Sequence, residues 1–180
     1  MNDLEIKQGT EQDIQEISVL YDTVTEYLES HTNYPGWKKG IYPTRTDAEE
    51  AAKEGTLYVA RLSGEIAGSV IVNQKQEKGY DSVPWKNGAV VEEVAVIHTF
   101  MVHPDYLRSG TGRLILEFAE KKAEEEGRKV IRLDVYEHNA PAIRLYESSG
   151  YEYMGTADLG YGTFGLNWFR LYEKLLQGKV

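Results

Sequence analysis

The sequence predicts one α/β domain over residues 1–180, and three patterns support this prediction. The segment "TLYVARLSGEIAGSVIVNQ" divides into two β-rich runs around Ser63 and Gly64, which is typical of an antiparallel hairpin. Apolar residues recur at helical spacing between Ile14 and Leu28. From Val90 onward a strand, a helix and a second strand follow in order, as in a crossover connection.

The N-terminal elements begin with "LEIKQ", which predicts a short strand at residues 4–8. Thr10 and Asp13 resemble the N-cap pair of the helix that follows. A second short helix is expected from Asp47 to Lys53, where Gly55 ends it. The two runs of the hairpin come next.

The segment "VVEEVAVIHTFMV", residues 90–102, is apolar on both alternating faces, which favours a central strand that is covered on both sides. An amphipathic helix follows it and ends at Gly127. The remaining elements are expected as a strand, a helix and two terminal strands, at residues 129–136, 141–149, 151–157 and 166–176.

The composition excludes several classes of protein. The chain contains no cysteine, so it has no disulfide framework, thiolate zinc site or cysteine nucleophile. Its net charge of −9 argues against a general nucleic-acid surface, and no apolar run is long enough to cross a bilayer. The start, "MNDLEIKQGT", is acidic where a signal peptide is basic. We therefore expect a soluble, cytoplasmic enzyme or binding module that binds neither nucleic acid nor membranes.

The stretch "HPDYLRSGTGRLILEF" runs from a proline-marked turn through Gly110 and Gly112 into the amphipathic helix. The unpaired amides and the dipole of a helix start attract phosphate, although two glycines also suit an ordinary tight turn. A Rossmann fingerprint does not fit, because Ile115 occupies its third glycine position and about seven residues separate Val102 from Gly110. A P-loop does not fit either, since no Gly-Lys-Ser/Thr follows the turn.

Two segments carry a family resemblance. "FMVHPDYLRSGTGRLIL" resembles motif A of the GNAT acetyltransferase superfamily, in which a strand ending in V-x-P leads to the turn (Q/R)xxGx(G/A). Gly110 and Gly112 occupy the two small positions, while Leu107 departs from the usual Gln or Arg. "NAPAIRLYESSGY", residues 139–151, resembles the N-x-x-A-x-x-L-Y-x-x-x-G-(F/Y) segment of the same family at every fixed position. The element order is similar to that of the family from Leu4 to Leu176.

The resemblance implies a mixed, mostly antiparallel twisted sheet of about six to seven strands with helices on both faces. The sheet would splay between its fourth and fifth strands, with acetyl-CoA in the opening. The implied reaction is direct transfer of the acetyl group of acetyl-CoA to a primary amine of a small molecule or peptide. A non-catalytic acyl-CoA-binding sensor or interaction module on the same fold is the alternative, and a homodimer is a further expectation.

The resemblance also implies roles for residues of the two motifs. The turn would bind the pyrophosphate of the cofactor through the backbone of Arg108, Ser109, Gly110, Thr111, Gly112 and Arg113. The pantetheine would pair with the backbone of Met101 and Val102, and Asn139 would add a polar contact. Tyr146 falls on the tyrosine that is commonly assigned as the acid toward the coenzyme A sulfur.

The amine proton needs an acceptor, and His98 is the first candidate because imidazole titrates in a useful range. A core histidine that is satisfied by a backbone carbonyl remains the alternative. Glu92 shares the strand parity of His98 and is a second candidate, unless it is a solvated strand start. No metal site is expected, since His31, His103 and His138 have no metal-ligand spacing.

Recognition of the acceptor is expected in "HTNYPGWKKGIYP", residues 31–43, where the family places acceptor walls. Tyr34, Trp37 and Tyr42 lie there among prolines and glycines that form turns. These rings suit a cationic amine through cation-π attraction, and packing in a lid is the alternative.

Overall fold

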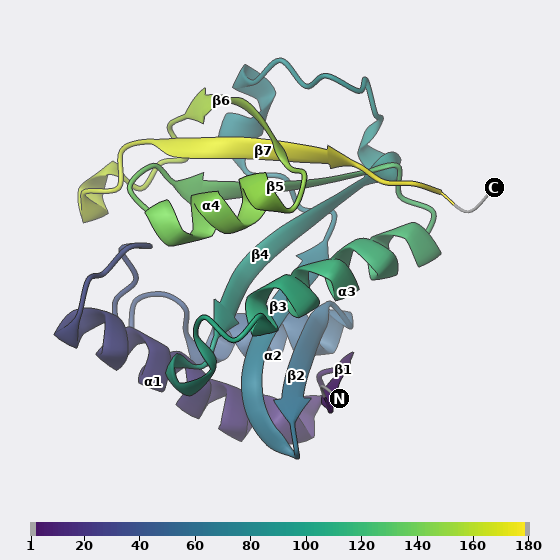
Figure 1. Ribbon diagram of the computed structural model, residues 1–180. Helices are drawn as coiled ribbons and strands as arrows, with labels where there is room; N and C mark the ends of the chain where they lie inside the picture. The colour runs from purple at the N-terminus through teal and green to yellow at the C-terminus, as the bar shows by residue number, and fades with distance from the viewer. Residues whose placement is uncertain (1–2, 179–180) are drawn as a thin grey trace. The chain divides into compact units, whose positions relative to one another are not determined.

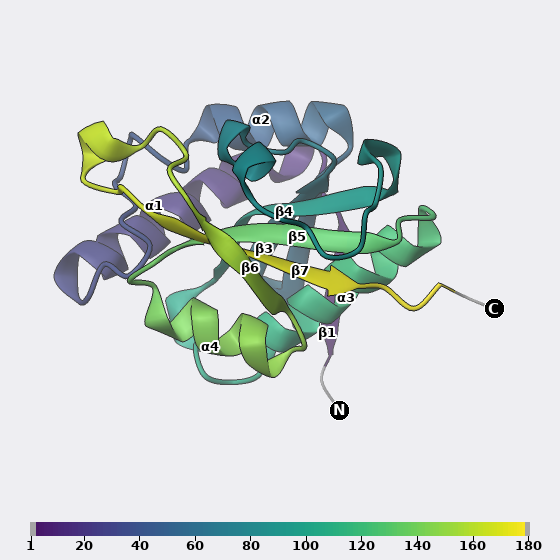
Figure 2. The ribbon, with the colours of Figure 1, turned by 90° about the horizontal axis from the view of Figure 1, so that it is seen from above.

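The computed structural model describes residues 3–178 (Figures 1 and 2), and its elements follow the predicted order. Within that range seven strands form a mixed, mostly antiparallel sheet in the order β1-β2-β3-β4-β5-β7-β6, as predicted. The strands are β1 Leu4–Gln8, β2 Leu57–Leu62, β3 Glu65–Asn73, β4 Val94–Val102, β5 Val130–Tyr136, β6 Glu152–Ala157 and β7 Phe169–Leu175. The helices are α1 Ile14–Ser30, α2 Arg45–Glu54, α3 Thr111–Glu125 and α4 Ala140–Ser148.

The chain forms two compact units. The first comprises residues 3–33, 37–72 and 99–119, and the second comprises residues 34–36, 73–98 and 120–178. β4 and α3 contribute to both, because β4 changes unit after residue 98 and α3 after residue 119.

In the first unit, helices cover both faces of the strands. Alternate side chains of a strand point to opposite faces, so Leu57 and Val59 of β2 share one face. They pack in a core with Ile17 of α1 and with side chains of α2. On the opposite face, Tyr58 packs edge-on against Phe118 of α3, with ring centroids 5.2 Å apart.

In the second unit, β5 is the central strand. Its first four residues pair in parallel with β4. All of its residues pair in antiparallel with β7. One face carries a buried core in which Val96 and Leu171 pack with Tyr80. α4 lies along the other face (Figures 1 and 2), where Tyr146 packs against Tyr172 with ring centroids 6.4 Å apart.

The start of β4 differs from the prediction. Residues Val91–Glu93 form a 3₁₀ turn rather than the beginning of the strand, and the strand starts at Val94. The turn closes on itself, since the Glu93 amide donates to the Val90 carbonyl over 2.9 Å. The prediction that Glu92 shares a strand face with His98 is therefore wrong.

The second helix begins two residues earlier than predicted, at Arg45. Thr44 is its N-cap, and the Thr44 amide and hydroxyl both donate to the Asp47 carboxylate, over 2.6 and 2.8 Å. Asp47 is thus the N3 residue of a capping box, and it is the third residue of the helix rather than the first. Thr10 and Asp13 form a capping box too, but it opens the 3₁₀ turn Glu11–Asp13 that leads into α1.

Candidate functional site

Strand β4 carries backbone strain at Thr99. This residue has a φ of +47°, in the left-handed region that is a genuine outlier for a β-branched side chain. Thr99 is buried, and its hydroxyl lies 2.5 Å from the hydroxyl of Tyr42. Such strain persists only where the surrounding structure imposes it, and it concentrates at functional sites. The strained residue begins the half of β4 that was predicted to bind pantetheine.

The C-terminal half of β4, from Thr99 to Val102, packs closely against β3. A Cβ placed on Gly68 would lie 2.5 Å from the Met101 carbonyl oxygen, and the His103 amide donates to Ala67 over 2.8 Å. The parallel pairing with β5 runs from Val94 to Ile97 and ends there. The Met101 side chain is buried in the core with α1 and α2. Met101 can therefore offer a ligand mainly its backbone, and the pairing of pantetheine with Met101 and Val102 stays a prediction.

The turn before α3 has the backbone geometry of an anion-binding loop. Arg108 and Gly110 have φ values of +59° and +88°, so left-handed residues flank Ser109. Such turns point successive amides into one concavity, and the first-turn amides of a helix, here that of Gly112, lack intrahelical acceptors. The space where a Cβ of Gly110 would lie is open, with nothing within 4 Å. The loop thus fits a phosphate-bearing group.

Two hydroxyl groups hold this turn. The Ser109 hydroxyl donates to the Tyr106 carbonyl over 2.5 Å and lies 2.8 Å from the Thr111 hydroxyl. The Leu114 amide returns to the Gly110 carbonyl over 3.2 Å, which starts the helical hydrogen bonds. Hydrogen bonds of its own side chains and backbone therefore hold the loop.

Tyr146 lies on α4 in the second unit and is almost fully buried. Burial raises the pKa of its phenol, and the charge of Asp134 raises that pKa further. The phenol is consequently protonated at neutral pH, as an acid must be. Asn139 is the N-cap of α4, where its Oδ1 accepts from the Ala142 amide over 3.4 Å. The side-chain oxygen of Asn139 is thus already engaged in capping α4.

His98 is the last residue of β4 that belongs to the second unit. Burial lowers the pKa of its imidazole to about 4, against a hydrogen bond with the Lys75 backbone that raises it. Its Nε2 is buried without a hydrogen-bond partner among the described residues. His98 is therefore a neutral ring at pH 7, with one ring nitrogen still to be satisfied.

Glu92 differs from the other candidates, because its side chain is exposed in the turn before β4. Its carbonyl oxygen accepts from the Arg128 guanidinium over 2.6 Å and from the Gln74 amide over 3.3 Å. The Glu92 backbone therefore helps to fix the turn that precedes β4.

The predicted acceptor aromatics fall into different units. Trp37 and Tyr42 belong to the first unit and meet edge-on, with ring centroids 5.9 Å apart. Trp37 also packs against the core of α1 and α2. Tyr34 belongs to the second unit and is exposed. The structure thus joins Tyr42 to Trp37 and to the strained Thr99.

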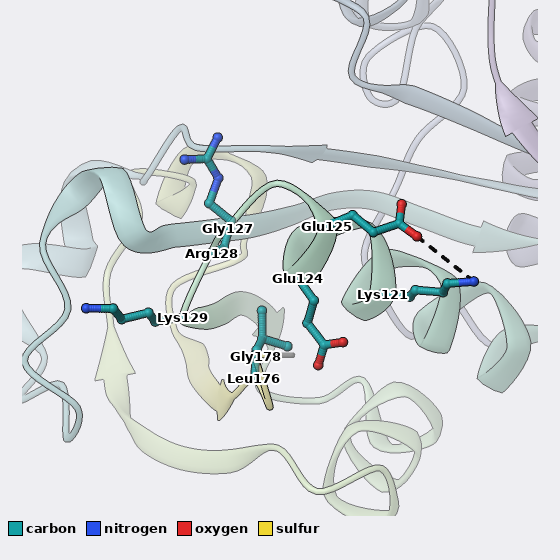
Figure 3. Close-up of a pocket in the computed structure, with 8 residues that line it drawn as sticks. All are labelled: Lys121, Glu124, Glu125, Gly127, Arg128, Lys129, Leu176 and Gly178. Carbon is teal, nitrogen blue, oxygen red and sulfur yellow. Dashed lines mark ion pairs between the residues drawn. The ribbon is translucent and has the colours of Figure 1, made fainter. Parts of the chain in front are cut away.

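A cavity of about 430 Å³ lies in the second unit near the end of α3 (Figure 3). No predicted site residue lines it, and its charged side chains point away from a common centre (Figure 3). The residues drawn there are Lys121, Glu124, Glu125, Gly127, Arg128, Lys129, Leu176 and Gly178. We assign this cavity no chemistry.

Residues 3–178 contain neither a cluster of metal ligands nor a helix that could span a membrane. In that range no three His, Asp or Glu side chains gather as metal ligands would. None of the helices in the same range has the length and apolar character needed to cross a bilayer.

A sequence model described as "Acetyltransferase (GNAT) family" matches residues 19–151, well over half of the chain. The chain belongs to the GNAT family of acetyltransferases. This assignment confirms the family resemblance of the two sequence motifs, and the seven-stranded mixed sheet agrees with it.

Two curated GNAT relatives match the chain over different lengths. An uncharacterised N-acetyltransferase in the pepI 3′ region of Lactobacillus delbrueckii subsp. lactis is 26% identical over 155 residues, which cover 83% of this chain and 85% of that protein. The ribosomal protein bS18-alanine N-acetyltransferase of Escherichia coli K12 is 42% identical over 62 residues. That match covers 34% of this chain and 42% of the enzyme, so the chain spans less than half of it.

Two solved structures of acetyltransferases share the fold. A GNAT acetyltransferase from Streptococcus agalactiae superposes with a TM-score of 0.81 at 19% identity, covering 98% of both chains. The yncA acetyltransferase from Salmonella typhimurium, solved with its cofactor acetyl-CoA, superposes with a TM-score of 0.68 at 15% identity. It covers 99% of this chain and 96% of that one. At these identities the likeness shows the fold alone.

Sequence reasoning did not name two residues of this GNAT chain as candidates for the acetyltransferase site, and it considered Asp134 only as the acid of the rejected Rossmann fingerprint. Asp134 is a carboxylate inside the apolar strand "VIRLDVY", and a charged residue there was the available signal. Burial raises its pKa to about 6. Thr99 gave no signal, because the left-handed backbone of a strand residue leaves no trace in the residue type.

Proposed function

We propose that the protein transfers the acetyl group of acetyl-CoA directly to a primary amine of a small molecule or peptide. The observation that carries the proposal is the turn before α3, where Arg108 and Gly110 have left-handed backbones just before the first-turn amides of the helix. A diphosphate is the group that such a loop at a helix start binds best. Family membership and the acetyl-CoA held by the Salmonella relative support the same cofactor.

The cofactor residues are those of the first motif and of the α4 cap. The backbone from Arg108 through Ser109, Gly110, Thr111 and Gly112 to Arg113 binds the diphosphate. Met101 and Val102 pair through their backbone with the pantetheine, and Asn139 adds a polar contact. When bound, the thioester supplies an activated acetyl group.

Tyr146 is the proposed acid. Its raised pKa keeps the phenol protonated, so it can donate a proton to the departing sulfur. His98 is proposed as an organiser of the incoming group rather than as a strong base, because its lowered pKa keeps the ring neutral. Its free Nε2 can accept or donate one hydrogen bond.

The aromatic residues Tyr34, Trp37 and Tyr42 are proposed to line the path of the acceptor. Tyr42 supports this role through its contact with Thr99 on β4, 2.5 Å between the hydroxyl oxygens. The Tyr42 side chain thus connects the proposed acceptor segment with β4, the strand whose backbone is proposed to bind the cofactor.

The test uses two matched valine substitutions. Gly110 and Gly64 both have a φ of +88° and open space at the Cβ position, so Gly110→Val and Gly64→Val bring the same backbone strain. Gly64 lies in the β2–β3 hairpin turn, outside the loop. We expect Gly110→Val to weaken coenzyme A binding about tenfold or more in calorimetry, and Gly64→Val to leave it unchanged. Equal affinities of the two variants would overturn the loop assignment.

Catalysis is tested by thiol release from acetyl-CoA with a panel of primary amines. Amine-dependent release supports the transfer reaction. Coenzyme A binding without any amine-dependent thiol would identify an acyl-CoA-binding module instead.

A further inference from the structure

Thr99 gives β4 a backbone conformation that its residue type does not favour. Its φ of +47° lies in the left-handed region, which glycine usually occupies because it has no Cβ. A left-handed residue inside a strand is typical of a bulge, which redirects the neighbouring backbone groups. Such a conformation persists only where the surrounding structure imposes it. A contact of Thr99 must therefore hold the strained backbone.

Tyr42 provides a contact of this kind. The Tyr42 and Thr99 hydroxyl oxygens lie 2.5 Å apart, so one hydroxyl donates to the other. Thr99 is buried, where a hydroxyl without a partner is costly. Both residues belong to the first unit. The hydrogen bond thus joins the segment before α2 to the point where β4 departs from regular strand geometry.

The segment that carries Tyr42 is itself fixed. The Tyr42 amide donates to the Lys38 carbonyl over 3.0 Å, and the Lys38 amide donates to the Tyr42 carbonyl over 3.2 Å. The Tyr42 ring meets Trp37 edge-on, and Trp37 packs against the core of α1 and α2. Thr44 follows two residues later and caps α2 by its bonds to Asp47. A side chain fixed on both flanks loses little entropy when it holds a partner.

The backbone after Thr99 is the part of β4 that is proposed to pair with pantetheine. Met101 and Val102 complete the strand, and the next amide, that of His103, donates to the Ala67 carbonyl over 2.8 Å. This short segment is therefore anchored at its end. A change of φ at Thr99 would turn the peptide groups of Met101 and Val102, because the end of the strand is fixed.

We propose that Tyr42 is a positioning residue, whose hydroxyl holds Thr99 in the left-handed conformation and thereby sets the β4 backbone for pantetheine. This inference rests on the proposed acetyl transfer. It gives Tyr42 a role toward the cofactor that differs from lining the path of the acceptor, because the role depends on the hydroxyl and not on the ring.

The first test compares wild type with Tyr42→Phe in calorimetric titrations with coenzyme A and with 3′-phospho-ADP, which is coenzyme A without its pantetheine arm. Tyr42→Phe removes the hydroxyl and keeps the ring that meets Trp37. Coenzyme A binding should weaken about three- to tenfold, as expected for the loss of one neutral hydrogen bond. Binding of 3′-phospho-ADP should not change. Unchanged coenzyme A affinity, or an equal loss for both ligands, would overturn the proposal.

The second test is a double-mutant cycle with Thr99→Val, which keeps the shape of the side chain and removes its hydroxyl. Thr99→Val should weaken coenzyme A binding as Tyr42→Phe does, and the double variant should lose little more, because both changes remove the same hydrogen bond. Additive losses would show that the two hydroxyl groups act independently, which contradicts the proposal.

Thr99→Gly tests whether the left-handed backbone is what the hydroxyl supports. Glycine adopts a positive φ without a partner, so Tyr42→Phe should cost less than about twofold in coenzyme A affinity when Thr99 is glycine. A full loss in that background would show that the Tyr42 hydroxyl acts in another way and would refute the positioning role.

Backbone chemical shifts report the conformation of Thr99 without any ligand. The Cα and Cβ shifts of Thr99 should be those of a left-handed residue in wild type and should move toward extended values in Tyr42→Phe. Shifts that stay unchanged would contradict the proposal. If wild type binds neither coenzyme A nor 3′-phospho-ADP, the proposed function falls, while these shifts still decide whether Tyr42 holds Thr99.

Tyr27→Phe is the matched control in the same unit. Tyr27 lies on α1, half-buried, and its ring stacks on His31 with centroids 4.0 Å apart. Its substitution removes a tyrosine hydroxyl and leaves the bond between Tyr42 and Thr99 in place. Tyr27→Phe should bind both ligands as wild type does and keep the Thr99 shifts. A loss of coenzyme A affinity as large as that of Tyr42→Phe would count against the proposal.

Discussion

Replacing Glu173 with Gln tests how far the second unit depends on a buried ion pair. The Arg132 Nε and a Glu173 oxygen lie 2.8 Å apart, and their side chains are 4% and 0% exposed. The other Glu173 oxygen accepts from the Asn87 side chain over 2.7 Å. Through these contacts β5, β7 and the segment before β4 share one polar centre.

The expected loss follows from the burial of both charges. Removing one partner of a buried pair leaves the other charge uncompensated, which costs about 3–5 kcal/mol. Arg132 keeps its hydrogen bond to Gln76 and its contact with the Trp85 ring, so we expect the lower part of that range. For a chain of this size each kcal/mol lowers the melting temperature by roughly 2–4 °C. Glu173→Gln should therefore melt at least about 6 °C lower.

Glu152 provides a control on the adjacent strand. It lies directly opposite Glu173 in the β6–β7 register and pairs with Lys86, but both side chains of that pair are 60% exposed. Glu152→Gln should cost less than about 1 kcal/mol, because solvent screens exposed pairs. The assay is urea unfolding at pH 7 with calorimetric melting. Similar small losses in both variants would refute the reasoning from burial.

Two further predictions concern the site. Tyr146→Phe should lower turnover about 100-fold or more and leave coenzyme A affinity unchanged, because only the proton donor is lost. Tyr153 is exposed, so the control variant Tyr153→Phe should be fully active. Single-turnover kinetics of both variants test this prediction. The Asp134 pKa is raised from 3.8 to about 6 in the folded protein, so the folded state binds more protons between these values and stability falls as pH rises through that window. Urea unfolding at pH 4 and 7.5 should therefore show that wild type loses on the order of 1–3 kcal/mol relative to Asp134→Asn over this window, because the opposite contribution of His98 is common to both proteins.

The order of elements could be predicted from the sequence because local patterns determine it. The hairpin around Ser63 and Gly64 and the strand at residues 4–8 lie where predicted, since their apolar alternation and turn residues agree. The start of β4 could not be predicted. Val90 and Val91 look like strand residues, but the Glu93 amide and carboxylate bind back to Val90 and form a turn. Local hydrogen bonds outweighed β propensity there.

The candidate site was predictable only where a motif marks it. The backbone of the loop at Gly110 follows from its glycines, and Arg108 in the left-handed region adds what the sequence does not show. The pairing of Tyr80 with Asp134 joins residues 54 positions apart, so no local pattern reports it. A lone carboxylate in an apolar strand indicates a special environment, but its partner comes only from the fold.

Tyr146, His98 and Asp134 in the second unit have different protonation states near neutral pH. Burial moves the pKa values of Tyr146, His98 and Asp134 in directions that keep the phenol protonated, the imidazole neutral and the carboxylate titrating at about 6. Groups whose environments drive their pKa values apart can act as separate acid and base near neutral pH. With a pKa of about 4, the His98 imidazole is a weaker proton acceptor than the Asp134 carboxylate, whose pKa is about 6. In the proposed transfer, His98 therefore orients the incoming group through its Nε2 rather than taking its proton.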